Sequence, residues 1–401
     1  MRFRCERDVL TEAIGTVSRA VSSRSSSPVL SGARFVLEGD RLQLTGSDLD
    51  LTITTTVTVA GQEDGRAVIP AKLVSDIVRA LEPGAVTIET EGEQAHISGG
   101  RSQFSVNLFP ADEFPQLGET SGDSVTLESD ELAAGLRQVV PAASADDSRP
   151  ILTGVLLAAE GTGLRLVSTD SYRLAVRDLP GTSVLAEGQH VLIPSRALGE
   201  LLRLLAHSDS VKLVLGERDA SFEVGETRLT TRLIEGDFPN YRGLIPTAQP
   251  NRLTVGREAL TEAVKRVRLL AREATPLRLT FRSDSLELLA LTQDVGQASE
   301  TVDAKYEGAE LTVAFNPEYL VNGLDASVGD EVSLETVDAL KPALLRSIES
   351  PDFLYLLMPV RVSGAVGPVA TRPGCGSITS RSSTSVRTRR PSSTWPRDST
   401  P

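Results

Sequence analysis

Apolar residues recur with helical spacing at two places in each third of the chain, and they alternate with polar residues in the stretches between. A first set of helices is predicted at residues 7–21, 130–143 and 257–272, where apolar side chains at i, i+4 and i+7 form one packing face. A second set is predicted to begin at prolines, which suit a first helical turn because their missing N–H is not needed there. These prolines are Pro70, Pro194 and Pro317. The alternating stretches, rich in β-branched residues and broken by Gly and Asp, indicate antiparallel strands joined by hairpins.

The order of helix, strands, helix and strands therefore occurs three times. Equivalent positions carry related residues, such as Leu10, Leu132 and Leu260 in the first helix of each copy. The dipeptide Phe-Pro also returns, at residues 114–115 and 238–239. Recurrence of this kind indicates an internal repeat rather than chance similarity among amphipathic elements. We predict an α+β fold of three tandem units, each with two helices packed on antiparallel sheets. The units are expected at residues 1–120, 121–250 and 251–361.

Bulk composition fits this picture and excludes several classes of protein. The chain has 401 residues, 40% of them hydrophobic, and a formal net charge of −13. No apolar stretch is long enough to span a membrane, and no apolar segment near the N-terminus predicts export. Cys5 and Cys375 lie far apart, so a disulfide framework or structural zinc site is not expected, and a cytoplasmic location is. The negative charge argues weakly against nucleic-acid binding, but a sum does not tell where the charges lie.

Residues with catalytic potential are few and scattered. His96, His190 and His207 show no metal-ligand spacing, and the sequence contains neither a phosphate-binding loop nor a nucleophile elbow. Asp48 and Asp170 follow strands at related places, and Asp294 is their expected counterpart in the third unit. Recurrence in every unit indicates a turn or capping role rather than a general base. No enzyme activity, metal or cofactor is predicted.

Several separated segments resemble one family. They are MRFRCERDVLTEAI at the N-terminus, RPILTGVLL and STDSYRLAV in the centre, and YLLMPVR near residue 361. Together with the three repeats, they are similar to the bacterial DNA polymerase III beta subunit, the sliding clamp. The resemblance implies a head-to-tail homodimeric ring with helices lining the hole, sheets forming the outer wall, and double-stranded DNA passing through. It also implies a non-catalytic processivity factor of DNA replication.

The second helices of the first two units carry matching cations. Lys72 aligns with Arg196 and Arg79 with Arg203, and seven residues separate the two cations of each helix, which places them on one face. Apolar residues are expected to form the buried stripe opposite: Leu73, Ile77 and Leu81 in the first copy, and Leu198, Leu201 and Leu205 in the second. In a ring the cations would face DNA phosphates without reading the base sequence. Taken singly, each is equally well a solvated surface charge.

The resemblance extends this set of cations and implies a second kind of site. The expected DNA-binding residues are Arg24, Lys72, Arg79, Arg137, Arg196, Arg203, Lys265, Arg268 and Arg272. The second site is an apolar pocket between the second and third units, which in the family binds short peptides of partner proteins. Its expected residues are Arg149, Leu152, Thr169, Tyr172, Arg173, Leu174, Pro239, Leu244, Met358, Pro359, Val360 and Arg361. Apolar walls with a few polar groups suit peptide binding, although ordinary core packing would explain any single apolar residue.

The implied partners are a second copy of the chain, DNA, the DNA polymerase III alpha subunit, the clamp loader and other proteins with the clamp-binding motif. The dimer seam is expected to join the first unit of one copy to the third unit of the other, through Phe104, Val106, Leu269 and Leu270. A head-to-tail contact of this sort forms a ring when its rotation closes. The residues alone supply only apolar candidates, and the resemblance supplies the closure.

Residues 362–401 depart from the family pattern. They hold six arginines, one aspartate and 15 Ser or Thr among 40 residues, a composition that cannot bury enough apolar surface to fold alone. A disordered appendage or an altered reading frame explains such a tail, and a sharper hypothesis lets it cover the adjacent pocket or touch DNA. Two alternative functions stay open: a specialised second clamp with altered partner or inhibitor binding, and a repeat scaffold that does not bind DNA.

Overall fold

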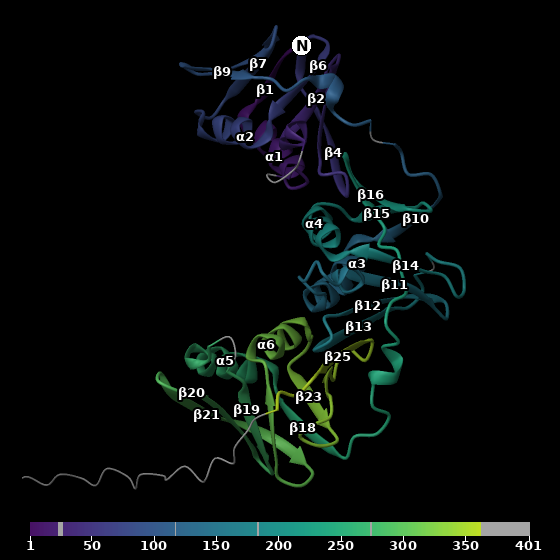
Figure 1. Ribbon diagram of the computed structural model, residues 1–401, viewed down its shortest axis with the longest axis vertical. Coiled ribbons are helices and arrows are strands. Elements are labelled where there is room, and N and C mark those ends of the chain that lie inside the picture. The colour runs from purple at the N-terminus through teal and green to yellow at the C-terminus, as the bar shows by residue number, and fades with distance from the viewer. Residues whose placement is uncertain (23–26, 117, 183, 273–274, 362–401) are drawn as a thin grey trace, which may run out of the picture. The chain divides into compact units, whose positions relative to one another are not determined.

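The computed structural model describes residues 1–22, 27–116, 118–182, 184–272 and 275–361 (Figure 1). Arg24, Cys375 and the tail 362–401 lie outside these residues, so the structure does not test what was expected of them. Within the described residues the order of helix, strands, helix and strands occurs three times, as the repeat predicted. None of their helices has the length and apolar content needed to cross a membrane.

Two α-helices belong to each repeat, and they pack against each other. The described helices are α1 (Arg7–Ser18), α2 (Ala71–Ala80), α3 (Ser129–Val139), α4 (Ser195–Leu205), α5 (Arg257–Val267) and α6 (Pro317–Ala326). Pro70 and Pro194 stand just before α2 and α4, one position earlier than predicted, whereas Pro317 is the first residue of α6. The side chain of Asn316 caps α6 by accepting a hydrogen bond from the backbone N–H of Glu318, which satisfies a free donor of the first turn.

Two details of the predicted helices are wrong. The first helix of the second and third repeats ends early, because the chain continues as 3-10 turns at Val140–Ala142 and Arg268–Leu270. In α2, Leu73 is 46% exposed, whereas Val74 and Val78 are fully buried. Successive helical residues are rotated by about 100°, so Leu73 lies on the flank of the helix rather than in its buried stripe. The other predicted members of the two stripes are buried: Ile77, Leu81, Leu198, Leu201 and Leu205.

The strands form three antiparallel sheets. The first, with the order β5-β1-β7-β8-β9, consists of β1 (Arg2–Glu6), β5 (Ala60–Glu63), β7 (Ala85–Glu91), β8 (Gln94–Gly99) and β9 (Ser102–Asn107). The second, with the order β10-β15-β16-β17-β4-β3-β2-β6, consists of β2 (Gly32–Glu38), β3 (Arg41–Ser47), β4 (Leu51–Thr58), β6 (Gly65–Pro70), β10 (Asp123–Glu128), β15 (Ser210–Leu215), β16 (Asp219–Val224) and β17 (Thr227–Arg232).

The third sheet is the largest and has the order β14-β11-β12-β13-β25-β24-β23-β18-β21-β20-β19-β22. Its strands from the second repeat are β11 (Gly154–Glu160), β12 (Gly163–Thr169), β13 (Arg173–Leu179) and β14 (His190–Pro194). Those from the third repeat are β18 (Asn251–Gly256), β19 (Leu277–Arg282), β20 (Ser285–Thr292), β21 (Gly296–Glu307), β22 (Leu311–Phe315), β23 (Glu331–Thr336), β24 (Ala343–Ser347) and β25 (Phe353–Leu357).

Two of these sheets run from one repeat into the next. Strand β4 of the first repeat pairs with β17 of the second, and β13 of the second pairs with β25 of the third. The boundaries expected near residues 120 and 250 therefore divide the chain but not its sheets, and the exact limits of the units stay predictions. Backbone hydrogen bonds join successive repeats directly.

The helices cover one face of the sheets, and the core lies between. Leu10, Ile14 and Val17 of α1 are fully buried, and burial of each such side chain contributes about 1.5–3 kcal/mol. Helix α1 approaches β3 very closely: a Cβ added to Gly46 would lie 2.1 Å from the carbonyl oxygen of Val17. No side chain fits there, so the glycine is required for this helix to pack on this strand.

The same tight turn follows the third strand stretch of every repeat. Leu49, Ser171 and Asp294 all have positive φ, at 80°, 81° and 68°. In the first two repeats the preceding aspartate stabilises the turn, since Oδ1 of Asp48 and of Asp170 each accepts two backbone N–H bonds. The predicted turn role of these two residues is confirmed. Asp294 is not their counterpart, because it occupies the position of Leu49 and Ser171, one residue later.

Candidate functional site

The pairing of β13 with β25 joins the second and third repeats at the place where the partner site was expected. We call this place, with its flanking residues 169–174 and 355–361, the 2–3 junction. Arg173 pairs with Leu357 across the two strands. Just beyond, the backbone N–H of Met358 donates to the carbonyl oxygen of Tyr172 at 2.8 Å, and that of Val360 donates to Ala314 at 2.8 Å. The first bond fixes the end of the third repeat against the turn of the second, and the second bond holds this end on β22 of the third repeat itself.

A buried polar frame holds this turn. The side chain of Arg173 is 9% exposed, and its Nε donates to Oδ2 of Asp170 at 3.0 Å. The guanidinium lies over the ring of Tyr319, 4.3 Å from its centroid, a favourable cation–π geometry. Tyr355 lies beside them, and its hydroxyl donates to the carbonyl oxygen of Tyr319 at 3.0 Å. Burial raises the pKa of Tyr355 to about 12, because the ionised phenolate cannot be hydrated there.

Arg149 ties the loop before β11 to the same turn. Its Nη1 donates to the carbonyl oxygen of Asp170 at 3.2 Å and to Oγ of Ser171 at 3.3 Å, while its Nε donates to Asp146 at 3.0 Å. The hydrogen bonds from Ser148 and its contact with Arg149 hold the pKa of Asp146 below its usual range. Arg149 therefore holds the turn at residues 170–171 in place, and its guanidinium is already hydrogen-bonded within the protein.

Apolar side chains remain open at the 2–3 junction. Tyr172 is 58% exposed, Met358 37% and Val360 38%. Leu244, which was expected in the same pocket, is 44% exposed in the 3-10 turn Arg242–Leu244, outside these flanking segments. Pro239 and Arg361 are also exposed, and Pro359 is half-buried. Leu152, Thr169 and Leu174 are buried, so they support the site from below and offer no surface to a ligand. Exposed apolar groups beside polar anchors are typical of peptide-binding surfaces, and the assignment of these residues to a partner stays a prediction.

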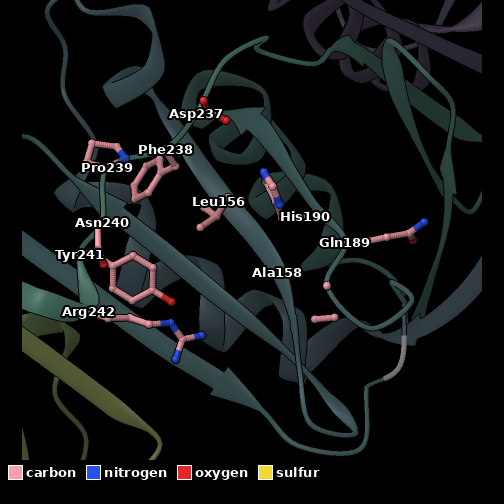
Figure 2. A pocket seen from close by; sticks show the side chains of 12 residues that line it. Leu156, Ala158, Gln189, His190, Asp237, Phe238, Pro239, Asn240, Tyr241 and Arg242 are labelled. Carbon is pink, nitrogen blue, oxygen red and sulfur yellow. The ribbon is translucent and has the colours of Figure 1, made fainter.

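A cavity that the sequence did not predict lies on the neighbouring part of the sheet (Figure 2). It has a volume of about 350 Å³ and lies between Leu156 and Ala158 of β11, residues 188–190, and the loop 237–242. Figure 2 shows His190 and Asp237 on one side of it and Tyr241 with Arg242 on the other. Only Pro239 belongs to the expected pocket. The repeated Phe-Pro dipeptide was the available signal, because it marks where this loop crosses the sheet.

The loop of this cavity is anchored at both ends. Phe238 and Tyr241 pack edge to face with ring centroids 6.3 Å apart, and both contact the apolar cluster around Leu156 and Leu174. Nη2 of Arg242 lies 2.5 Å from Oε2 of Glu160. The hydrogen bond from Arg242 lowers the pKa of Glu160. The apolar outer face of the sheet is thereby covered by the chain itself.

The cations expected to face DNA lie on the surface, with different degrees of engagement. Lys265 is partly exposed, and the others in the described residues are exposed: Lys72, Arg79, Arg137, Arg196, Arg203, Arg268 and Arg272. Arg196 pairs with Asp48 at 2.5 Å, Arg203 with Glu200 at 3.1 Å, and Lys265 with Glu262 at 3.3 Å. Among the described residues, no carboxylate lies within 4.0 Å of Lys72, Arg79, Arg137, Arg268 or Arg272. Sequence reasoning missed Asp48 as the partner of Arg196. The contact of all these cations with DNA stays a prediction.

Two strand edges that pair with no other strand in the described part of the chain accompany the expected dimer residues. Strand β9 is the last strand of its sheet, and Phe104 on it is 38% exposed. In the third repeat, residues 296–303 of β21 pair with β20, whereas only residues 304–307 pair with β18. Leu269 is 81% exposed, and the next residue, Leu270, is half-buried. Val106 is only 4% exposed, so it belongs mainly to the core of its own repeat and offers little to a second copy.

No group of three or more His, Cys, Asp or Glu side chains in the described ranges has the geometry to hold a metal ion. Cys5 is buried in the first sheet, and burial raises the pKa of its thiol.

Comparison with known proteins gives one consistent result. Three family models match in chain order: the N-terminal domain of the DNA polymerase III beta subunit over residues 1–118, its central domain over 126–240 and its C-terminal domain over 242–361. The beta sliding clamp of Streptomyces coelicolor is 37% identical over 381 residues, covering 91% of this chain and all of that protein.

Solved structures agree with the sequence relatives. The DNA polymerase sliding clamp of Bacillus subtilis is 31% identical, with a TM-score of 0.83 over 90% of this chain and 99% of its own. The sliding clamp of Bartonella birtlesii, solved with griselimycin bound, is 32% identical, with a TM-score of 0.86 over 90% of this chain and all of its own.

Proposed function

Because the chain belongs to the family of DNA polymerase III beta subunits, the beta sliding clamps, we propose that two copies close head to tail around duplex DNA and tether replication proteins to it. The observation that carries this proposal is the match of three clamp-domain models, in order, to three structural repeats. The chain is accordingly a processivity factor of DNA replication. The comparisons do not favour a DNA-independent scaffold or a specialised second clamp.

Ring closure is supported by the two strand edges at opposite ends of the folded chain. An unpaired edge presents a row of backbone N–H and C=O groups that another strand can satisfy. Strand β9 of one copy and residues 296–303 of its partner would complete each other, with Phe104 and Leu269 removed from water. The first repeat of each copy would contact the third repeat of the other, so the contact is head to tail.

Retention on DNA rests on topology, and the surface cations lower its electrostatic cost. Lys72 and Arg79 on α2 lie on the exposed side of the helix and lack carboxylate partners among the described residues. Contacts of this kind bind phosphates without reading bases, so they allow sliding. Arg196 contributes when a phosphate takes the place of Asp48, and Arg203 when one takes the place of Glu200.

Partner recognition takes place at the 2–3 junction. A short segment of the polymerase alpha subunit, the clamp loader or another partner lays apolar side chains against Tyr172, Met358 and Val360. Methionine adapts to ligands of different shape, which suits one site shared by several proteins. The polar frame of Asp170, Arg173 and Arg149 holds the site in place before a ligand arrives. The protein itself catalyses no reaction in this account, and it works in the cytoplasm where the chromosome lies.

A topological experiment tests the proposal. The full chain is loaded by an ATP-driven clamp loader onto nicked circular DNA, and retention is measured by gel filtration before and after the circle is cut once. We expect retention on circles and release after linearisation. Equal retention on both forms would contradict encirclement.

A charge experiment tests the assigned inner face separately. Reversing Lys72, Arg79 and Arg196 to Glu should weaken retention and reduce the slope of log K against log salt concentration by about 1–3. Reversing Arg278 and Arg282, which lie on a strand of the third repeat, is a control with two reversed charges instead of three and should leave the slope unchanged. An unchanged slope for the first variant would remove these residues from the DNA-facing surface.

A further inference from the structure

The first and second repeats meet in the same way as the second and third, and we call this place the 1–2 junction, with its flanking residues 47–52 and 229–235. Thr231 pairs with Leu51 across β17 and β4, as Leu357 pairs with Arg173 across β25 and β13. The backbone N–H of Arg232 then donates to Asp50 at 2.9 Å, as that of Met358 donates to Tyr172 at 2.8 Å.

The turns that frame the two junctions also match. Leu49 and Ser171 have the same positive φ, and Asp48 and Asp170 make the same pair of backbone hydrogen bonds. These coincidences align the two junctions residue by residue. Asp50 stands where the 2–3 junction has Tyr172, and Arg232 stands where it has Met358.

The outer face of the sheet differs completely between the two places. At the 2–3 junction, Val167, Leu174, Val176 and Leu356 belong to an apolar cluster that the loop with Phe238 and Tyr241 covers. The aligned residues at the 1–2 junction are all threonines: Thr45, Thr52, Thr54 and Thr230. A hydroxyl surface does not attract an apolar loop, so the connecting segment leaves space above it.

The space at the 1–2 junction is a cavity of about 700 Å³, within the usual range for a ligand site. Pro115, Gln116, Gly118 and Glu119 of the connecting segment form one side of it. Four arginines and four acids line it together with the threonines. They are Arg34, Arg218, Arg228, Arg232, Asp50, Asp219, Glu119 and Glu235.

The charges in this cavity are not equally committed. Arg228 contacts Glu119 at 3.3 Å and Glu223 at 2.9 Å, and Asp219 accepts a hydrogen bond from Thr120 at 2.8 Å. Arg232 only approaches Asp50, at 3.9 Å. Among the described residues, Arg34 and Arg218 have no carboxylate within 4.0 Å. Three guanidinium groups are therefore available to a ligand.

We propose that the 1–2 junction is a second peptide-binding site, specific for an extended segment in which carboxylate side chains alternate with hydroxyl or amide side chains. The carboxylates bind Arg34, Arg218 and Arg232, since charge-assisted bonds to arginine are the strongest that the cavity offers. The ligand's hydroxyl or amide groups bond to the threonines. A continuous polyanion is excluded, because Asp50 and Glu235 would face its phosphates. The choice of a peptide as the ligand rests on the function proposed for the 2–3 junction, whereas the chemistry of the cavity does not.

The test uses the full-length chain and three labelled probes: a ten-residue peptide of alternating Glu and Ser, one of alternating Lys and Ser, and a ten-nucleotide single-stranded DNA. Fluorescence anisotropy should show binding of the Glu–Ser peptide and at least about tenfold weaker binding of the other two. The double variant R218S/R232S should weaken the Glu–Ser peptide by at least about tenfold. The control R4S/R101S should not; it changes two exposed arginines, one on β1 and one in the turn between β8 and β9.

Threonine methyl resonances show where the probe lies. We expect the Glu–Ser peptide to shift the signals of Thr52, Thr54 and Thr230, and an apolar Leu/Phe peptide to leave them unchanged. Binding of the Glu–Ser peptide that is lost in Met358→Asp, or that is unchanged in R218S/R232S, would overturn the proposal. So would equal binding of the Lys–Ser peptide or of the DNA, or no binding at about 1 mM peptide. If the apolar peptide fails to bind, the function of the 2–3 junction fails, and the Glu–Ser result stands on its own.

Discussion

The 1–2 and 2–3 junctions show how one backbone arrangement supports two different surfaces. Each has a strand pair, a left-handed turn residue, an aspartate that accepts two backbone N–H bonds, and one further hydrogen bond after the strand. At the 2–3 junction the outer face is aliphatic and its own loop covers it, whereas at the 1–2 junction threonines leave it open. The turn aspartate and its hydrogen bonds therefore determine the backbone geometry of each junction, and the side chains on the outer face of the sheet determine whether its surface is apolar or polar.

Removal of the turn aspartate should give the largest difference in stability between the two junctions. Asp170→Ala leaves the buried guanidinium of Arg173 without its carboxylate, and we expect the free energy of unfolding to fall by about 3–5 kcal/mol. Asp48→Ala leaves Arg196, whose side chain is 55% exposed, and should cost about 1–2 kcal/mol, mostly through the lost turn bonds. Urea denaturation of both variants measures the difference.

The double variant D170A/R173L is the control for this explanation. It removes the stranded charge together with its partner, so it should recover part of the loss. Equal destabilisation by Asp48→Ala and Asp170→Ala would mean that the turn, and not the buried charge, dominates at both junctions.

Alkaline pH should weaken the 2–3 junction in a way that the 1–2 junction cannot reproduce. Burial raises the pKa of Tyr355 to about 12, whereas an unfolded tyrosine titrates near 10. The folded state therefore keeps its proton longer, so the contribution is complete below pH 10 and is lost as the pH rises to 12. We expect the free energy of unfolding to fall by about 2–3 kcal/mol over this range.

The matched variant is Tyr355→Phe, which should lack this part of the pH dependence. At the equivalent position the 1–2 junction has Leu229, which cannot ionise. The measurement is denaturant unfolding at several pH values, and the difference between the two proteins isolates Tyr355 from other titrating groups. Identical slopes would show that Tyr355 titrates at its ordinary value.

A charged residue in place of Met358 should make the exposed surface of the 2–3 junction polar, as the surface of the 1–2 junction is. Met358→Asp should weaken binding of an apolar Leu/Phe peptide by about 30-fold or more, or about 2 kcal/mol, since buried apolar anchors dominate peptide binding. Isothermal titration measures the affinity. Val328→Asp, at another exposed apolar residue, is the control, and an equal loss there would point to net charge and not to the site.

The smallest expected effect concerns the left-handed turns. Leu49 is 47% exposed and has a φ of 80°, so Leu49→Gly relieves backbone strain at little cost in packing. We expect it to stabilise the protein by about 1 kcal/mol. Ser171→Gly should gain less, because it also loses the contact of Oγ with Arg149. A scan of thermal unfolding compares them, and a destabilising Leu49→Gly would contradict the strain.

Periodicity predicted the six helices, the repeat and the α+β class, because burial of one helical face is a local property of the sequence. It misplaced Leu73, since a leucine on the flank of a helix cannot be told from one in the stripe by spacing alone. The recurrence of aspartates after strands misplaced Asp294, because the third repeat keeps the turn but lacks the aspartate before it. The ion pair of Arg196 with Asp48 was beyond reach, since it joins residues 148 positions apart.

The candidate sites were predictable only in part for the same reason. The resemblance named Leu152, Thr169 and Leu174, but these proved to be buried supports, and exposure depends on what packs from elsewhere. The cavity at the 1–2 junction needed the register of β4 with β17, which no single segment encodes. Alignment of the two repeats in sequence did place the Phe-Pro dipeptides that precede both connecting segments.

The pairing of strands across both repeat boundaries has a mechanical consequence. Prying the chain apart at either boundary would break a row of backbone hydrogen bonds at once, whereas parting two copies leaves the ladders of each polypeptide whole. The contact proposed between two copies also joins strand edges, but separating the copies breaks no pairing within either polypeptide. In the proposed ring, circular DNA, which has no free ends, would have to enter between the two copies.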